Sequence, residues 1–484
     1  MPPIQQPPAN GGSGSDVPPP PVPDERLSRP VPESFVRQFL GDVQGNILKG
    51  HGRPYVKCLF FTFVSGDDKA AAGPVVRNWI RRLANDVVTS APRQLEETEL
   101  YHNHGIPGGL FGAFFLSSAG YRYLGADLPV PPPFPGAADL NADAFAAGMK
   151  ASKDVLKDPA AGEWETYFRS DIHAMLLLAD VDPARLNQAA TRAILDIKPV
   201  THALHVEHGH VINNEHGDGI EHFGYTDGVS QPLFLAEDLA KGNENGQEKL
   251  SVWDPGAGPN LVLAPDRNGT RDYSFGSYFV FRKLEQNVKG FKEMEEKMAE
   301  ALRLAGEDAE RAGALLVGRF EDGTPVTLQG AEGMHHPIPN GFTYRDDGSG
   351  SKCPFQAHIR KVNPRTEDKN GHRIARRGIP YGNRKPDFSD RPTKDVGLLF
   401  MCYQQRIENQ FEAMQAHWAN DPDFNGPGVG IDPIVGQGDR TKQQYAFEWG
   451  KDEPDKGKFK FDAFVKMRGG EYFFAPSISF LKSL

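Results

Sequence analysis

Short apolar segments rich in β-branched and aromatic residues recur along the chain in two successive series, separated by amphipathic stretches. Such segments predict strands, because these residue types pack well on a pleated, half-buried surface. The first series of strands is predicted at residues 56–64, 108–118, 171–182 and 201–212. Helices are predicted between them at 71–87 and 183–197, and the second opens with a proline, which the first turn of a helix tolerates.

A second series repeats this pattern in the other half of the chain. Strands are predicted at residues 276–284, 396–404 and 469–477, and helices at 287–306 and 406–420. Two such sets at non-uniform spacing predict an α+β fold of two domains with antiparallel sheets. The polar, Gly- and Pro-rich stretches 125–165, 307–357 and 421–460 are expected to be long irregular connections, which in compact domains are usually functional or disordered.

Composition divides the chain further. Residues 1–32 are rich in Pro, Gly and Ser and nearly lack large apolar residues, so they are predicted to be a disordered tail. The two predicted domains then occupy residues 33–235 and 236–484.

The charge balance and the cysteines exclude several classes of protein. A net charge of −10 argues against a nucleic-acid partner. No apolar run approaches the roughly 20 residues of a membrane helix, and the start lacks the regions of a secretory signal. Cys58, Cys353 and Cys402 are too widely spread for a disulfide framework or a zinc motif. A cytoplasmic location is therefore expected, with export by a non-classical route left open.

Two kinds of candidate metal ligand occur among the histidines. Six crowd the region 202–222, but no pair there has a zinc-finger or zincin spacing, and a non-haem metal site stays an alternative. His358 stands apart in "CPFQAHIRK" (353–361), where a neutral imidazole is a good axial ligand for haem iron and Arg360 can pair with a haem propionate.

Two further stretches contain charged residues on flexible backbone. "FGYTDGVSQP" (223–232) places Asp227 between Gly224 and Gly228, in a turn that ends on a proline. "RIARRGIPYG" (373–382) contains Arg376 and its neighbour in a short polar loop. Paired arginines in a loop are most often solvated, so neither stretch alone indicates a function.

In combination, these stretches resemble dye-decolourising peroxidases, and the likeness is to the longer, fungal-like branch of that family. It runs from about residue 40 to the C-terminus. The segments that carry it are "DVQGNILKGHGR" (42–53), "GYTDGVSQP" (224–232), "GSYFVFRKLEQNV" (276–288), "CPFQAHIRK", "RIARRGIPYG", "GLLFMCYQ" (397–404) and "DPIVGQ" (432–437). The resemblance implies two ferredoxin-like domains, with haem b between the sheet and the helices of the C-terminal half.

The resemblance also implies roles for residues of this chain. Asp227 matches the distal acid, Arg376 the distal arginine and His358 the proximal iron ligand. Gly224 and Gly228 complete the G-x-x-D-G motif, and they are expected to let the backbone turn tightly beside the porphyrin.

Further matches extend this set of residues. Leu398 and Phe400 match residues that roof the distal pocket. Asp432 matches an acid that accepts a hydrogen bond from the proximal histidine, with Glu408 as the reserve candidate. Tyr381 and Trp418 resemble surface aromatics that relay electrons from bulky donors, although each can equally serve only to pack its segment.

The implied activity is a haem peroxidase that reduces hydrogen peroxide through a ferryl intermediate and oxidises dyes, phenols or similar donors. Asp227 would move a proton between the peroxide oxygens, and Arg376 would stabilise the developing charge. A model aspartate titrates near about 3.9, well below the roughly 6.5 of a histidine, so an acidic pH optimum is expected. The alternative is a haem carrier on the same scaffold, which would need His358 but neither Asp227 nor Arg376.

Overall fold

The computed structural model describes residues 39–132, 143–244, 252–271, 273–334, 337–385 and 388–484. The predicted tail at 1–32 lies outside these residues, as does part of the predicted connection 125–165. None of the helices in the described ranges combines the length and the apolar character needed to span a bilayer.

Strands and helices alternate as the two series predict. The strands are β1 (Tyr55–Phe63), β2 (Phe111–Leu116), β3 (Ala174–Asp180), β4 (Thr201–His210), β5 (Ile212–Asn213), β6 (Gly219–Ile220), β7 (Ala264–Pro265), β8 (Phe275–Gln286), β9 (Ala375–Arg376), β10 (Ile379–Tyr381), β11 (Gly397–Gln404), β12 (Gln443–Tyr445), β13 (Gly457–Phe459) and β14 (Val465–Ala475). The α-helices are α2 (Lys69–Asp86), α3 (Ala91–His104), α4 (Ser118–Leu124), α5 (Ala144–Ala147), α6 (Lys153–Leu156), α7 (Pro183–Ile197), α8 (Ala236–Glu244), α9 (Val288–Ala301), α10 (Arg311–Val317), α11 (His358–Val362) and α12 (Ile478–Ser483).

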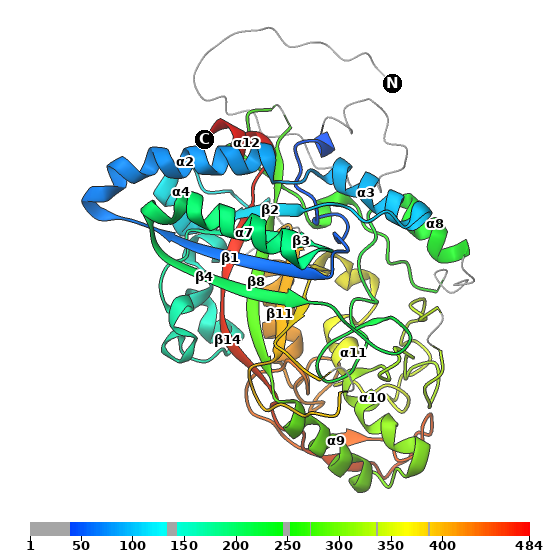
Figure 1. The fold of residues 1–484 in the computed structure, drawn as a ribbon. Helices are drawn as coiled ribbons and strands as arrows, with labels where there is room; N and C mark the ends of the chain where they lie inside the picture. The colour runs from blue at the N-terminus through cyan, green and yellow to red at the C-terminus, as the bar shows by residue number, and fades with distance from the viewer. Residues whose placement is uncertain (1–38, 133–142, 245–251, 272, 335–336, 386–387) are drawn as a thin grey trace.

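The first four strands form an antiparallel sheet in the order β2–β3–β1–β4. Helices α2 and α7 lie together on one face of this sheet (Figure 1). Side chains alternate between the faces of a strand, so Phe61 and Phe63 of β1 meet Trp79 of α2 while Phe60 faces the other way. This order, with helices after the first and third strands, is the ferredoxin-like arrangement.

The second series builds the same arrangement. Strand β8 lies between β14 and β11, and the short strands β9 and β10 both pair with β11. The predicted α+β fold with two ferredoxin-like antiparallel sheets is therefore confirmed. The domain boundary at residues 235 and 236 stays a prediction.

The two sheets join edge to edge and close into one ring of strands. Strand β2 meets β14 where Leu116 faces Phe474, and β4 meets β10 where Gly209 faces Tyr381. Aromatic rings fill the enclosed space, since Phe60 of β1 contacts Phe281 of β8, with ring centroids 4.8 Å apart. The sequence patterns did not predict this closure.

Two predictions about local structure need correction. The helix predicted at 406–420 is π-helical, in two segments at Glu408–Glu412 and Met414–Ala419. The connections 307–357 and 421–460 are not wholly irregular, because the first contains α10 and the second the hairpin β12–β13. These elements are too short to show a periodic pattern in the sequence.

Alternation along β8 decides which residues face the helices outside the ring. Phe281 and Lys283 face the interior, whereas Arg282 and Leu284 line a cavity on the outer face. The Arg282 guanidinium donates to the Asp158 carboxylate at 2.8 Å, and the two side chains are 4% and 0% exposed. This buried pair ties the segment after α6 to the cavity wall.

We expect Asp158→Ala to lower the free energy of unfolding by about 3 to 5 kcal/mol, because it leaves the buried Arg282 cation without a partner. Denaturant unfolding of the haem-free chain measures this. The double variant Asp158→Ala/Arg282→Met should recover most of the loss, since no buried charge is then left alone. A single variant within about 1 kcal/mol of wild type would mean that the pair behaves like an exposed one.

Candidate active site

A cavity of about 250 Å³ lies against the outer face of the second sheet. Strands β8 and β11 supply one wall, through Leu284, Leu398 and Phe400 among others. Helix α11, the π-helical segments and the turn 223–232 supply much of the rest, and further residues such as Arg319, Arg365 and Ile434 complete it. The cavity thus brings together segments that are far apart in the sequence, and it contains both Leu398 and Phe400, as predicted.

Asp227 and Arg376 meet in this cavity. Arg376 Nη1 donates to Asp227 Oδ1 at 2.6 Å, and the Gly228 amide donates to the same oxygen at 2.6 Å. Strand pairing of Arg376 with Cys402 of β11 fixes the arginine backbone. Asp227 Oδ2 has no hydrogen-bond partner among the described residues, so this oxygen is left for a ligand.

The charge of Arg376 determines the ionisation of Asp227. Burial alone would raise the pKa of the Asp227 carboxyl, but the Arg376 guanidinium outweighs burial and holds that pKa below its ordinary value. The carboxylate therefore persists into acidic solution, as a proton acceptor that works there must.

The two glycines of the motif have different structural roles. Gly228 lines the cavity and has φ of 81°, in the left-handed region that favours glycine. Gly224, with φ of 104°, does not line it; a Cβ there would lie 2.9 Å from the Glu321 carboxylate. The left-handed φ of Gly224 fits the expected tight turn, and the nearby Glu321 carboxylate further disfavours a side chain there. Its place beside the porphyrin stays a prediction.

His358 opens α11 and faces the same cavity. Its Nδ1 is 2.8 Å from the fully buried Asp432 carboxylate, the contact predicted for these two residues. Burial alone would raise the pKa of Asp432. The charge of His358, its hydrogen bond and the amides of Ile434 and Val435 together outweigh burial, so that the pKa of Asp432 lies below its ordinary value. Glu408, the reserve candidate, instead accepts from the Ala144 amide. Nε2 of His358 has no partner among the described residues.

Two buried arginines in the cavity wall carry charge that no described carboxylate balances. Arg319 and Arg365 donate to backbone carbonyls and to Asn340, and Arg365 Nε is buried without a hydrogen-bond partner. Burial lowers the pKa of Arg365 to about 9 and that of Arg319 to about 10. An anionic ligand in the cavity would supply the missing partner.

Arg360, the residue predicted to pair with a propionate, is placed elsewhere. Its guanidinium donates to Asp347 at 2.8 Å and to the Asp347 carbonyl at 2.9 Å, and it does not line the cavity. The prediction is wrong because the first turn of α11 carries this side chain away from the face on which His358 lies.

The residues present fit a haem. The cavity offers a free imidazole nitrogen for iron, two unpaired guanidinium groups for two propionates, and walls with many apolar side chains. Neither Arg319 nor Arg365 was predicted. In the sequence, Arg365 could have been considered as a propionate partner because it lies seven residues after His358, in "VNPR". Its burial is visible only in the folded chain.

Tyr381 and Trp418 are not surface residues, since each side chain is only 6% exposed. The Lys283 ammonium lies 4.9 Å from the centre of the Tyr381 ring. Trp418 stacks on Phe424 and meets the edge of His372. The predicted surface position is therefore wrong for both, and neither lines the cavity.

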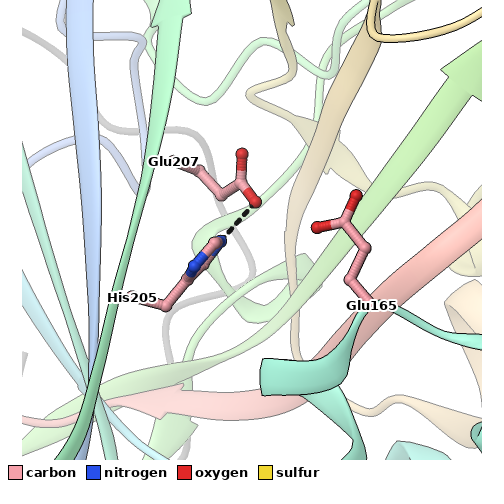
Figure 2. Close-up of side chains that lie close together, drawn as sticks. All are labelled: Glu165, His205 and Glu207. Carbon is pink, nitrogen blue, oxygen red and sulfur yellow. Dashed lines mark hydrogen bonds and ion pairs between the residues drawn. The ribbon is translucent and has the colours of Figure 1, made fainter.

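The crowded histidines do not converge on a metal site in the described residues. Only His205 joins a ligand cluster, with Glu207 beside it on β4 and Glu165 opposite (Figure 2). The Lys283 ammonium is already 2.8 Å from Glu207 and 3.0 Å from Glu165. This lysine supplies the positive charge that a metal ion would otherwise bring.

Comparison with known proteins places this geometry in a family. A family model described as Dyp-type peroxidase, C-terminal, matches residues 242–426. Multifunctional dye peroxidase DyP2 of Amycolatopsis sp. is 43% identical over 465 residues, covering 92% of this chain and 96% of that protein. Dye-decolorizing peroxidase msp1 of Mycetinis scorodonius is 29% identical over 92% of this chain and 87% of its own length.

Solved structures agree. The crystal structure of a DyP-type peroxidase from Anabaena sp. is 41% identical and superposes with a TM-score of 0.84, covering 92% of this chain and 95% of that one. The structure of DyP2 from Amycolatopsis sp. is 41% identical with a TM-score of 0.88, covering 95% and 99%.

Proposed function

The chain belongs to the dye-decolourising peroxidases, and from this we propose that its cavity binds haem b and serves to reduce hydrogen peroxide. The family is haem-dependent, and the chain is a peroxidase that oxidises dyes. We further propose the residue roles given below and an acidic pH optimum. The proposal also includes an oxidised haem intermediate and the use of phenols as donors.

His358 Nε2 would hold the iron, and Arg319 and Arg365 would hold the propionates. When bound, haem supplies the iron that takes up peroxide and the redox capacity that the reductants later restore. Asp432, by accepting from His358 Nδ1, makes the imidazole a stronger electron donor.

Asp227 performs the proton transfer. Its Oδ1 is held by Arg376 and Gly228, so Oδ2 would take a proton from one oxygen of hydrogen peroxide and deliver it to the other. The oxygen that receives the proton would leave as water when the O–O bond breaks, and Arg376 would stabilise the negative charge that develops on it. The two electrons that this cleavage requires would come from the haem, when bound.

The observation that carries the proposal is the contact of 2.6 Å between Arg376 and Asp227, in a cavity that His358 also lines. A haem carrier would need His358 but has no use for a carboxylate held ionised by a guanidinium. A haem-loaded chain whose absorption spectrum does not respond to peroxide would select the carrier instead.

We expect Asp227→Asn to bind haem normally but to react with peroxide about 10²- to 10⁴-fold more slowly, because the proton acceptor is lost. Stopped-flow absorption of the haem-loaded chain measures the rate. In wild type, activity should peak in acid, and on the acid side of that peak it should fall as the pH drops through the lowered pKa of Asp227.

Arg376→Met is the matched control. The Gly228 amide and the charge of His358 are then left to oppose the effect of burial on the pKa of Asp227, so the acid limb should move to higher pH. Wild-type profiles that peak above neutrality for several donors would contradict Asp227 as the base.

For dyes too bulky to enter the cavity, we propose that Tyr381 and Trp418, although buried, relay electrons through the protein to the cavity. Replacing both with Phe should slow the oxidation of dyes and spare that of small phenols, in steady-state assays of the haem-loaded variant. Equal losses for both donor types would instead indicate a folding defect and count against the relay.

A further inference from the structure

Glu221 lies in the cavity wall, just before the turn that carries Asp227. Its carboxylate accepts hydrogen bonds from the backbone amides of Phe223, at 2.9 Å, and Tyr225, at 3.0 Å. These amides flank Gly224, whose φ of 104° lies in the left-handed region. The Glu221 side chain therefore fastens the backbone on both sides of the glycine that turns the chain toward Asp227.

Glu221 differs from Asp227 in its partners. Asp227 is paired with Arg376, whereas no ion pair reaches Glu221 from the described residues. Its third donor is the neutral amide of Gln286, whose own Oε1 is buried without a partner in the described part of the chain. With that amide turned over, Oε1 would accept the O–H of a protonated Glu221, so a hydrogen bond is available in either protonation state.

The charged groups around Glu221 come from three segments. Asp227 acts on it from its own turn, Arg384 from the segment after β10, and the Glu321 carboxylate lies across Gly224. Strand β8 presents the neutral Gln286.

The two acids of the cavity therefore ionise in different pH ranges. Burial raises the pKa of Glu221 to about 7. The three N–H donors to Glu221 lower this pKa in part, and the negative charge of Asp227 raises it. Arg376 holds the pKa of Asp227 below its ordinary value. Paired acids in one site whose pKa values are pushed apart in this way take different parts in proton chemistry.

We propose that Glu221 is a positioning acid of this active site, which holds the turn carrying Asp227 and sets, by its own protonation, the charge beside the Asp227–Arg376 pair. The proposal rests on the function proposed above. While Glu221 is neutral, it adds no negative charge beside the Asp227 carboxylate that Arg376 pairs with. Once Glu221 ionises, a second negative charge weakens the stabilisation that Arg376 gives to the departing peroxide oxygen.

The test uses two readouts on the haem-loaded full-length chain. Infrared spectra of protein with isotopically labelled glutamate carboxyls should show a protonated-acid band that disappears with a midpoint near pH 7. The rate of reaction with peroxide should fall with the same midpoint, about tenfold between the neutral and ionised forms. Glu221→Gln should lack both the band and the fall.

Glu295→Gln is the matched control, because the pKa of Glu295 is also raised by burial but Glu295 does not line the cavity. Glu295 accepts from the Tyr225 hydroxyl and pairs with Lys292 on its own helix. It should keep the fall in rate with rising pH. Should Glu221→Gln not fold, Gln286→Leu tests the same point, since loss of its donor should move the band and the rate midpoint together to higher pH.

Given an active wild type, the inference is overturned if the Glu221→Gln variant keeps the fall in rate with rising pH. It is also overturned if the Gln286→Leu variant moves neither the midpoint of the infrared band nor that of the rate. A haem-loaded wild type without any peroxidase activity would instead overturn the proposed function, and the infrared band distinguishes the two failures because it does not depend on turnover.

Discussion

The contact between a guanidinium and a half-buried carboxylate, Arg376 with Asp227, is the interaction on which this active site depends. It joins the two halves of the fold, because Asp227 follows the strands of the first sheet and Arg376 lies on β9 of the second. Each residue is fixed by backbone pairing of its own segment. The edge-to-edge closure of the sheets therefore determines whether the two groups meet, and a loosened ring would separate them.

Three carboxylic acids around the cavity have similar side chains, but their local environments shift their pKa values in different directions. Asp227 is kept ionised by Arg376, and Asp432 is kept ionised by His358 and two backbone amides. Among the described residues, Glu221 accepts hydrogen bonds from neutral N–H donors only, and burial dominates its pKa. A single fold can thus supply a proton acceptor, a partner for the iron ligand and a group that titrates near neutrality, since the local partner outweighs the intrinsic acidity in each case.

Much of this organisation can be predicted from the sequence, and the rest depends on long-range placement. Strand periodicity predicts both sheets, and the resemblance identifies Asp227, His358 and Arg376. The closure of the ring rests on isolated pairings such as Leu116 with Phe474, which leave no local pattern. The sequence predicts Arg360 as a propionate partner because it lies close to His358, and it does not single out Arg365. In the folded chain Arg360 pairs with Asp347, and Arg365 lines the cavity. Tyr381 and Trp418 are buried, which sequence position alone does not show.

His358 is proposed to hold the iron of a haem whose propionates meet Arg319 and Arg365. Titration of the haem-free chain with haem, followed by the Soret band, should therefore show stoichiometric binding. We expect His358→Ala to abolish this binding, Arg365→Met to weaken it and Arg360→Met to leave it unchanged. Binding that survives His358→Ala with an unaltered spectrum, or that depends on Arg360 rather than Arg365, would disprove these assignments.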